Sequence, residues 1–146
     1  MEHTYTISTA INRPAHDVFE ALLDPQKLVH YFADRVSGRL EPGARITWSW
    51  SEWGDYPVVV DEVIPDRRIV LRLDTVDWKK SKSDAYDITV TIELESLDSG
   101  RTMLRISESG WKRDADGLRG SYDNCGGWQH MALCLKAWIE HDIDLR

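Results

Sequence analysis

Two glutamates, Glu62 and Glu108, stand where their side chains could do acid–base chemistry. Each follows an apolar residue at a spacing of two, Val60 before Glu62 and Ile106 before Glu108. Side chains two residues apart lie on the same face of a strand, so both carboxylates are predicted to point inward near a strand end. There they could hold the cation of a ligand or serve as general acid and base. The alternative is that both strand ends bend and both carboxylates reach solvent.

Seven tryptophans are the other unusual feature of the chain. Trp48 and Trp50 share one face of a predicted strand, and Trp128 lies on the apolar face of the last predicted helix. Trp78 and Trp111 lie at strand ends or in loops. Indole rings in such places can form the wall of a pocket for an apolar or planar ligand. The alternatives are packing in the core and, for the two loop residues, contact between subunits.

His130 and Cys134 are four residues apart on the last predicted helix. At this spacing they could ligate a metal, or pair as a nucleophile and its base. No Asp or Glu completes the set with a recognisable spacing, and the sequence contains no glycine-rich phosphate loop and no nucleophile elbow. We therefore expect no metal, no cofactor and no catalytic nucleophile.

The two cysteines, Cys125 and Cys134, are predicted to be free thiols. They lie on the same predicted helix, whose rise of about 1.5 Å per residue places their Cα atoms about 13 Å apart, beyond the ~7 Å limit for a disulfide. Free thiols are typical of a reducing compartment. The first residues show no signal peptide, and no stretch approaches the ~18 apolar residues that span a bilayer. We expect a cytoplasmic protein.

The charge of the chain argues against two classes of partner, and its length predicts the number of domains. A net charge of −7 argues against non-specific binding to nucleic acid and against binding to anionic membranes. With 146 residues, of which 42% are hydrophobic, the chain is predicted to form one domain over residues 1–146.

Six strands and two short helices are predicted ahead of the last helix. Alternation from Thr4 to Ile11 indicates the first strand, and two short helices follow, separated by Asp24 and Pro25. After Gly38 the hydrophobic period is two, which is typical of strands. The five further strands, which are joined mostly by turns and so predict an antiparallel meander, include residues 46–50, 58–64, 69–73, 86–94 and 104–106. Residues 78–83 and 113–121 are predicted loops.

The last predicted element is a long helix from about Asp123 to Ile143. Apolar side chains recur there in a narrow stripe at 100° per residue, at Trp128, Ala132, Leu135, Ile139 and Ile143. The glycines at 126 and 127 weaken its first turn. The order of elements predicts an α+β fold in which a curved antiparallel sheet wraps around this helix.

Five segments of the sequence resemble the family named for the activator of the heat-shock-protein-90 ATPase. They are INRPAHDVFEALLDPQKLVHYF, LEPGARITW, VDEVIPDRRIVLRL, TMLRISESGW and GGWQHMALCLKAWIE, which occur in this order over nearly the whole chain. The family belongs to the START-like and birch-pollen-allergen-like (SRPBCC) helix-grip superfamily. This resemblance implies a cavity between the concave face of the sheet and the long helix.

We therefore expect the protein to bind an apolar or aromatic small molecule in that cavity rather than to act as an enzyme. One alternative is a protein-interaction module, either a chaperone partner or a homodimer. Another is an enzyme resembling the cyclases or hydrolases of the superfamily, with Glu62 or Glu108 as the acid or base. The predicted cavity residues are Trp48, Trp50, Val60, Glu62, Leu71, Tyr86, Ile88, Glu108, Trp111, Trp128, Ala132 and Leu135.

Overall fold

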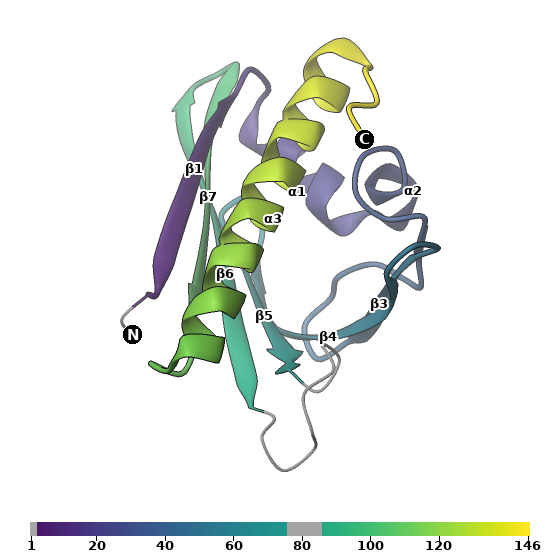
Figure 1. Ribbon diagram of the computed structural model, residues 1–146. Coiled ribbons are helices and arrows are strands. Elements are labelled where there is room, and N and C mark those ends of the chain that lie inside the picture. The colour runs from purple at the N-terminus through teal and green to yellow at the C-terminus, as the bar shows by residue number, and fades with distance from the viewer. Residues whose placement is uncertain (1–2, 76–85) are drawn as a thin grey trace.

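The computed structural model describes residues 3–75 and 86–146, which form a curved antiparallel sheet, two short helices and one long helix (Figure 1). Trp78 and the predicted loop 78–83 lie outside the described residues. The strands are β1 (Tyr5–Ile11), β2 (Arg35–Val36), β3 (Arg45–Trp50), β4 (Gly54–Ile64), β5 (Arg68–Asp74), β6 (Asp87–Asp98) and β7 (Arg101–Ser109). The helices are α1 (Ala15–Leu23), α2 (Pro25–Leu28) and α3 (Ala115–His141). The predicted α+β class is confirmed.

The sheet has the strand order β1-β7-β6-β5-β4-β3-β2, so the first strand pairs with the last. The described residues form seven strands where six were predicted. The additional strand is β2, in which Arg35 and Val36 pair with Ser49 and Trp48 of β3. Two residues are too few to show a period of two, so the sequence pattern contained no signal for this strand.

Helix α3 is longer than predicted at its N-terminal end. It begins at Ala115 rather than near Asp123, so the predicted loop 113–121 is wrong. Glycines at 117 and 120 lower the helix propensity of the first turns, so the sequence pattern there did not indicate a helix. The Asp114 side chain caps the helix by accepting a hydrogen bond from the Gly117 amide at 2.8 Å. At the other end, Asp142 stops the helix in the left-handed conformation, with φ 55°.

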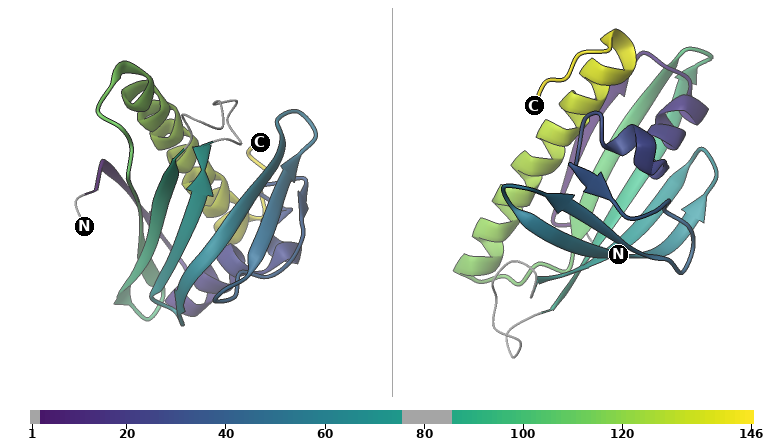
Figure 2. Two further views of the ribbon diagram at one scale, coloured as in Figure 1. Left: turned by 90° about the horizontal axis from the view of Figure 1, so that it is seen from below. Right: turned by 90° about the vertical axis from the view of Figure 1, so that its right-hand side faces the viewer.

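The two short helices between β1 and β2 were predicted, and they close one end of the concave face (Figure 2). Helix α1 buries an almost continuous apolar face, at Val18, Phe19, Ala21, Leu22 and Leu23. Asp24 ends α1 and caps α2 by accepting from the Gln26 amide at 2.9 Å. The buried Tyr31 hydroxyl then donates to the Ala21 carbonyl at 2.7 Å, which ties the segment after α2 back to α1.

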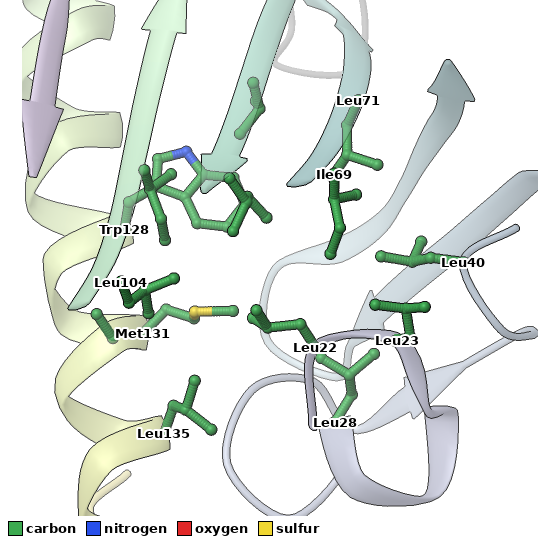
Figure 3. Close-up of a cluster of buried hydrophobic side chains, with 14 of the residues drawn as sticks. Leu22, Leu23, Leu28, Leu40, Ile69, Leu71, Leu104, Trp128, Met131 and Leu135 are labelled. Carbon is green, nitrogen blue, oxygen red and sulfur yellow. The ribbon is translucent and has the colours of Figure 1, made fainter. Parts of the chain in front are cut away.

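The core lies between the sheet, α3 and the short helices. In Figure 3, Met131 and Leu135 of α3 face Leu22 and Leu28 of the short helices. Each fully buried leucine contributes roughly 1.5–3 kcal/mol relative to an exposed one. Both cysteines are free, as predicted. Among the described residues, no helix combines the length and the apolar character needed to cross a membrane.

Candidate ligand-binding groove

A cavity of about 1590 Å³ opens between α3, the β3–β4 hairpin and the segment that follows β7. Its walls are rich in aromatic side chains that come from separate parts of the chain. These are Tyr31, Phe32, Trp48, Trp50, Trp53, Tyr56, Tyr86, Trp111 and Trp128. We call this cavity the groove. Its lining residues come from α3, from β3 and β4, and from the segments next to them.

Phe32 lies at the centre of one aromatic wall. Its ring meets the rings of Trp48 and Trp50 edge-on, with centroids 5.0 and 4.9 Å apart, and lies nearly parallel to Trp128 of α3 at 6.1 Å. The Trp50 indole donates to the Phe32 carbonyl at 2.7 Å, which fixes that ring on the chain that follows α2. Contacts of this kind are worth about 0.5–1.5 kcal/mol each beyond the area they bury.

Glu108 is fully buried and binds two of the tryptophans that line the groove. Its Oε1 accepts from the Trp111 indole at 2.8 Å, and its Oε2 accepts from the Trp128 indole at 2.8 Å and the Asn124 amide at 3.0 Å. The prediction that Glu108 points inward is correct. However, Glu108 is not among the residues that line the groove, whereas the three residues that donate to it are.

Tyr5 stands on β1 directly opposite Glu108 of β7. Its hydroxyl is buried and makes no hydrogen bond of ordinary geometry within residues 3–75 and 86–146. Burial raises the pKa of the Tyr5 hydroxyl well above its ordinary value of 10.0, and the negative charge of Glu108 and the contact of the hydroxyl with its carboxylate raise it further. Tyr5 is therefore a neutral neighbour of Glu108 at pH 7.

Trp111 is held in place from several sides. Its ring packs against α3 at Gly120, where a Cβ atom would overlap the ring. The Tyr86 ring meets it edge-on, with centroids 6.4 Å apart. Lys112 completes this corner, with its Nζ 4.9 Å from the centre of the Tyr86 ring. This corner of the groove thus combines two aromatic rings with a cation.

Five of the predicted cavity residues line the groove, namely Trp48, Trp50, Tyr86, Trp111 and Trp128. The apolar residues Val60, Leu71, Ile88, Ala132 and Leu135 are buried in the core instead and do not reach the groove. Phe32 was not among the predicted cavity residues, because its position depends on the path of the chain after α2. Its aromatic type next to Tyr31 was the one available signal.

The predicted inward orientation of Glu62 is wrong. A β-bulge between Val60 and Glu62 leaves Asp61 as an extra residue in β4, which reverses the faces that follow. The Glu62 side chain is 46% exposed and pairs with Arg68 at 3.3 Å. Strands β5 and β6 separate it from Glu108, a distance of about 14 Å at ~4.8 Å per strand. The two carboxylates therefore do not form an acid–base pair.

His130 and Cys134 both line the groove, with 3.5 Å between the Cys134 Sγ and the His130 Nε2. Burial raises the pKa of the Cys134 thiol above 9.0, and Arg146 offsets this only in part. The thiol is therefore protonated at neutral pH, and a protonated thiol is a poor nucleophile. Within the described part of the chain, no three His, Cys, Asp or Glu residues are arranged to hold a metal ion.

The groove is lined by charged as well as aromatic side chains. Acidic residues outnumber basic ones there, with Asp34, Glu52, Asp74, Asp114, Asp116 and Asp123 against Lys112, Arg119 and Arg146. Arg146 pairs with Asp144 at 2.9 Å, and Asp34 accepts from the Ser51 amide at 2.7 Å. The groove therefore combines aromatic surface with a net excess of acidic side chains.

Comparison with solved structures identifies the fold. SSP2350 from Staphylococcus saprophyticus aligns with a TM-score of 0.74 and 24% identity, over 97% of this chain and 96% of that one. The Aha1 dimer from Colwellia psychrerythraea aligns with a TM-score of 0.76 and 17% identity, over 97% and 98%. DynU16, a protein of the dynemicin biosynthetic locus, aligns with a TM-score of 0.76 and 18% identity, over 94% of this chain. This chain spans 47% of DynU16, about half its length.

Comparison of the sequence with protein families identifies the family of this chain. No curated protein matches the chain. A family model described as Activator of Hsp90 ATPase homolog 1-like protein matches residues 12–140, which include both short helices, strands β2 to β7 and nearly all of α3. The resemblance inferred from the five sequence segments is thereby confirmed, and the chain belongs to the family of Activator of Hsp90 ATPase homolog 1-like proteins.

Proposed function

We propose that the groove binds an apolar or aromatic small molecule. The observation that carries this proposal is the set of aromatic rings on a cavity of about 1590 Å³. Ligand pockets usually measure about 300–1,000 Å³ and are lined mainly by apolar and aromatic groups, with a few polar ones. This groove is large enough for such a ligand. The fold shared with DynU16, from a biosynthetic locus, is consistent with a small-molecule ligand.

The rings that remain exposed favour a planar ligand. Trp53, in the turn between β3 and β4, is 67% exposed and lines the groove, and Trp50 is half-buried. An exposed indole face can stack on a flat ring and lose its water-accessible area. One such contact is worth about 0.5–1.5 kcal/mol beyond the buried area. Stacking on these faces would thus select flat or aromatic ligands over compact aliphatic ones.

The direct test is native mass spectrometry of the protein purified from its own host. We expect a species heavier than the chain, which loses the additional mass on denaturation. The same spectrum gives the number of subunits.

A titration with 1-anilinonaphthalene-8-sulfonate tests the groove itself. Trp53 and Tyr122 are both 67% exposed, but only Trp53 lines the groove. Trp53→Ala should weaken binding of the dye roughly five- to tenfold, the equivalent of about 1–1.4 kcal/mol. Tyr122→Ala, the matched control, should leave the dissociation constant unchanged. Equal dissociation constants for the two variants and the wild type would contradict binding in the groove.

A second candidate function is association with another protein, of which a second copy of this chain is the simplest case. Leu118 and Tyr122, one turn apart on α3, are 50% and 67% exposed. Exposed apolar residues one turn apart can form part of a subunit interface. The related fold from Colwellia psychrerythraea was solved as a dimer, and the family description names a chaperone ATPase. Sedimentation velocity tests self-association: a dimer that Tyr122→Ser dissociates would support it, and a strict monomer would exclude it.

A further inference from the structure

Glu108 is a carboxylate in an unusual environment. It is fully buried, and the hydrogen bonds described for it come from neutral N–H groups of Trp111, Asn124 and Trp128. A buried charge is costly unless it is hydrogen-bonded, and a well-packed apolar side chain in its place often costs less. Leu104 and Ile106, which precede Glu108 by four and two residues on the same face of β7, are apolar and buried. Packing alone therefore does not account for a carboxylate at this position.

The two indoles that Glu108 binds both line the groove, and they come from different elements. Trp111 follows β7, whereas Trp128 lies in the middle of α3. Each indole has a single N–H donor, so one hydrogen bond of fixed direction sets the orientation of the whole ring. In Figure 3 the ring nitrogen of Trp128 points away from Met131, so the opposite edge of the ring faces the apolar cluster.

The two oxygens of the Glu108 carboxylate accept from different donors. Oε1 accepts from Trp111, and Oε2 accepts from Trp128 and Asn124. Because the carboxylate is planar, the positions of its oxygens fix the two rings relative to one another. The same group also joins the end of β7 to α3, the two elements between which that side of the groove lies.

We propose that Glu108 is the positioning residue of the groove, which holds the Trp111 and Trp128 rings in the orientation that the ligand meets. This inference rests on the proposed ligand binding. Glu108 does not touch the ligand itself, since it is fully buried and does not line the groove. Its effect on affinity is transmitted through the direction of the two indole N–H groups.

The test is Glu108→Gln in the full chain, with two independent measurements. A glutamine keeps one acceptor oxygen but turns an NH₂ group toward an indole donor, so at least one ring loses its partner. We expect the dissociation constant for 1-anilinonaphthalene-8-sulfonate to rise at least tenfold. Hydrogen exchange at the indole N–H of Trp111 or Trp128, followed by NMR, should accelerate at least tenfold. Exchange at Trp50, whose indole donates to the Phe32 carbonyl, should not change.

Glu140→Gln is the matched control. The Glu140 side chain is only 5% exposed and is hydrogen-bonded, but it lies near the other end of α3 and does not line the groove. Its loss should lower stability without changing the dye affinity or the indole exchange of Trp111 and Trp128. A change of equal size in both variants would show that Glu108 acts only through overall stability.

A folded Glu108→Gln protein with a dissociation constant within twofold of the wild type and unchanged indole exchange would overturn the proposal. If this variant does not fold, the wild type still decides: Trp111 and Trp128 indole protons should exchange at least a hundredfold more slowly than that of the exposed Trp53. Fast exchange at either residue would also overturn it. If the wild type binds no dye, the proposed function fails, while the exchange measurements still test the positioning of the rings.

Discussion

Tyr5 and Glu108 face each other across β1 and β7, yet in the described part of the chain the buried Tyr5 hydroxyl makes no hydrogen bond of ordinary geometry. The Glu108 oxygens already accept from two indoles and one amide. The hydroxyl has thus lost water and gained only a poorly aligned contact with the Glu108 carboxylate. A buried polar group in this state costs about 1–3 kcal/mol.

Replacement of Tyr5 by Phe should therefore be tolerated. We expect the free energy of unfolding of Tyr5→Phe to be unchanged or about 1 kcal/mol higher, because no well-formed hydrogen bond is lost. Tyr31→Phe is the matched comparison, since the buried Tyr31 hydroxyl donates to the Ala21 carbonyl at 2.7 Å. It should lower the free energy by about 1–2 kcal/mol. Urea unfolding measures both, and a loss above 1 kcal/mol in Tyr5→Phe would show that its hydroxyl is bonded.

Two glycines of α3 should respond in opposite directions to the same substitution. A Cβ atom at Gly120 would overlap the buried Trp111 ring, whereas one at Gly126 has no atom within 4 Å. Gly120→Ala should lower the free energy of unfolding by about 1–3 kcal/mol through overpacking. Gly126→Ala should raise it by about 0.5–1 kcal/mol, since alanine is the better helix former. Thermal unfolding measures both, and a stable Gly120→Ala would mean that the Trp111 ring moves aside easily.

Glu140 should make the stability depend on pH. Burial alone would raise the pKa of its carboxyl, but hydrogen bonds from the Asn12 amide and the Lys136 ammonium outweigh burial and hold the pKa below 4.5. A carboxyl whose pKa is lowered by folding stabilises the protein above its unfolded pKa and loses that contribution as the pH falls through its folded pKa.

Glu140→Gln should consequently cost about 1–2 kcal/mol at pH 7. The difference from the wild type should shrink as the pH falls below about 4.5. Urea unfolding of both proteins at pH 7, 5, 4 and 3 measures this difference. If it stays constant down to pH 3, the charge of Glu140 does not stabilise the fold.

The sequence predicted those parts of the fold that depend on regular patterns. Alternation located β1 and β3 to β7, and the apolar stripe located α3 from about Asp123 onward. Each feature that the sequence pattern did not predict has a local physical cause. The bulge at Asp61 reversed the face of Glu62, glycines concealed the start of α3, and β2 has only two residues.

The groove could be predicted by residue type more readily than by position. Tryptophans were selected because their size requires a partner, and Trp48, Trp50, Trp111 and Trp128 do line the groove. Phe32 could not be selected, because its place is set by tertiary contacts with three other rings. The contacts of Glu108 likewise depend on the packing of β7 near α3, and the sequence pattern does not show which elements contact one another.

The pairing of β1 with β7 also bears on how the chain folds as it is synthesised. Tyr5 and Glu108 are partners in this pairing, and α3 adds further bonds to the first strand, from Gln129 to Thr9 and from Lys136 to Ala10. During translation β1 is synthesised first, but it cannot pair with β7 until most of the chain has left the ribosome. Contacts between such distant residues slow folding, to milliseconds or longer in β-rich domains. We therefore expect the β1 edge of the sheet to form last, after β7 and α3 have been synthesised.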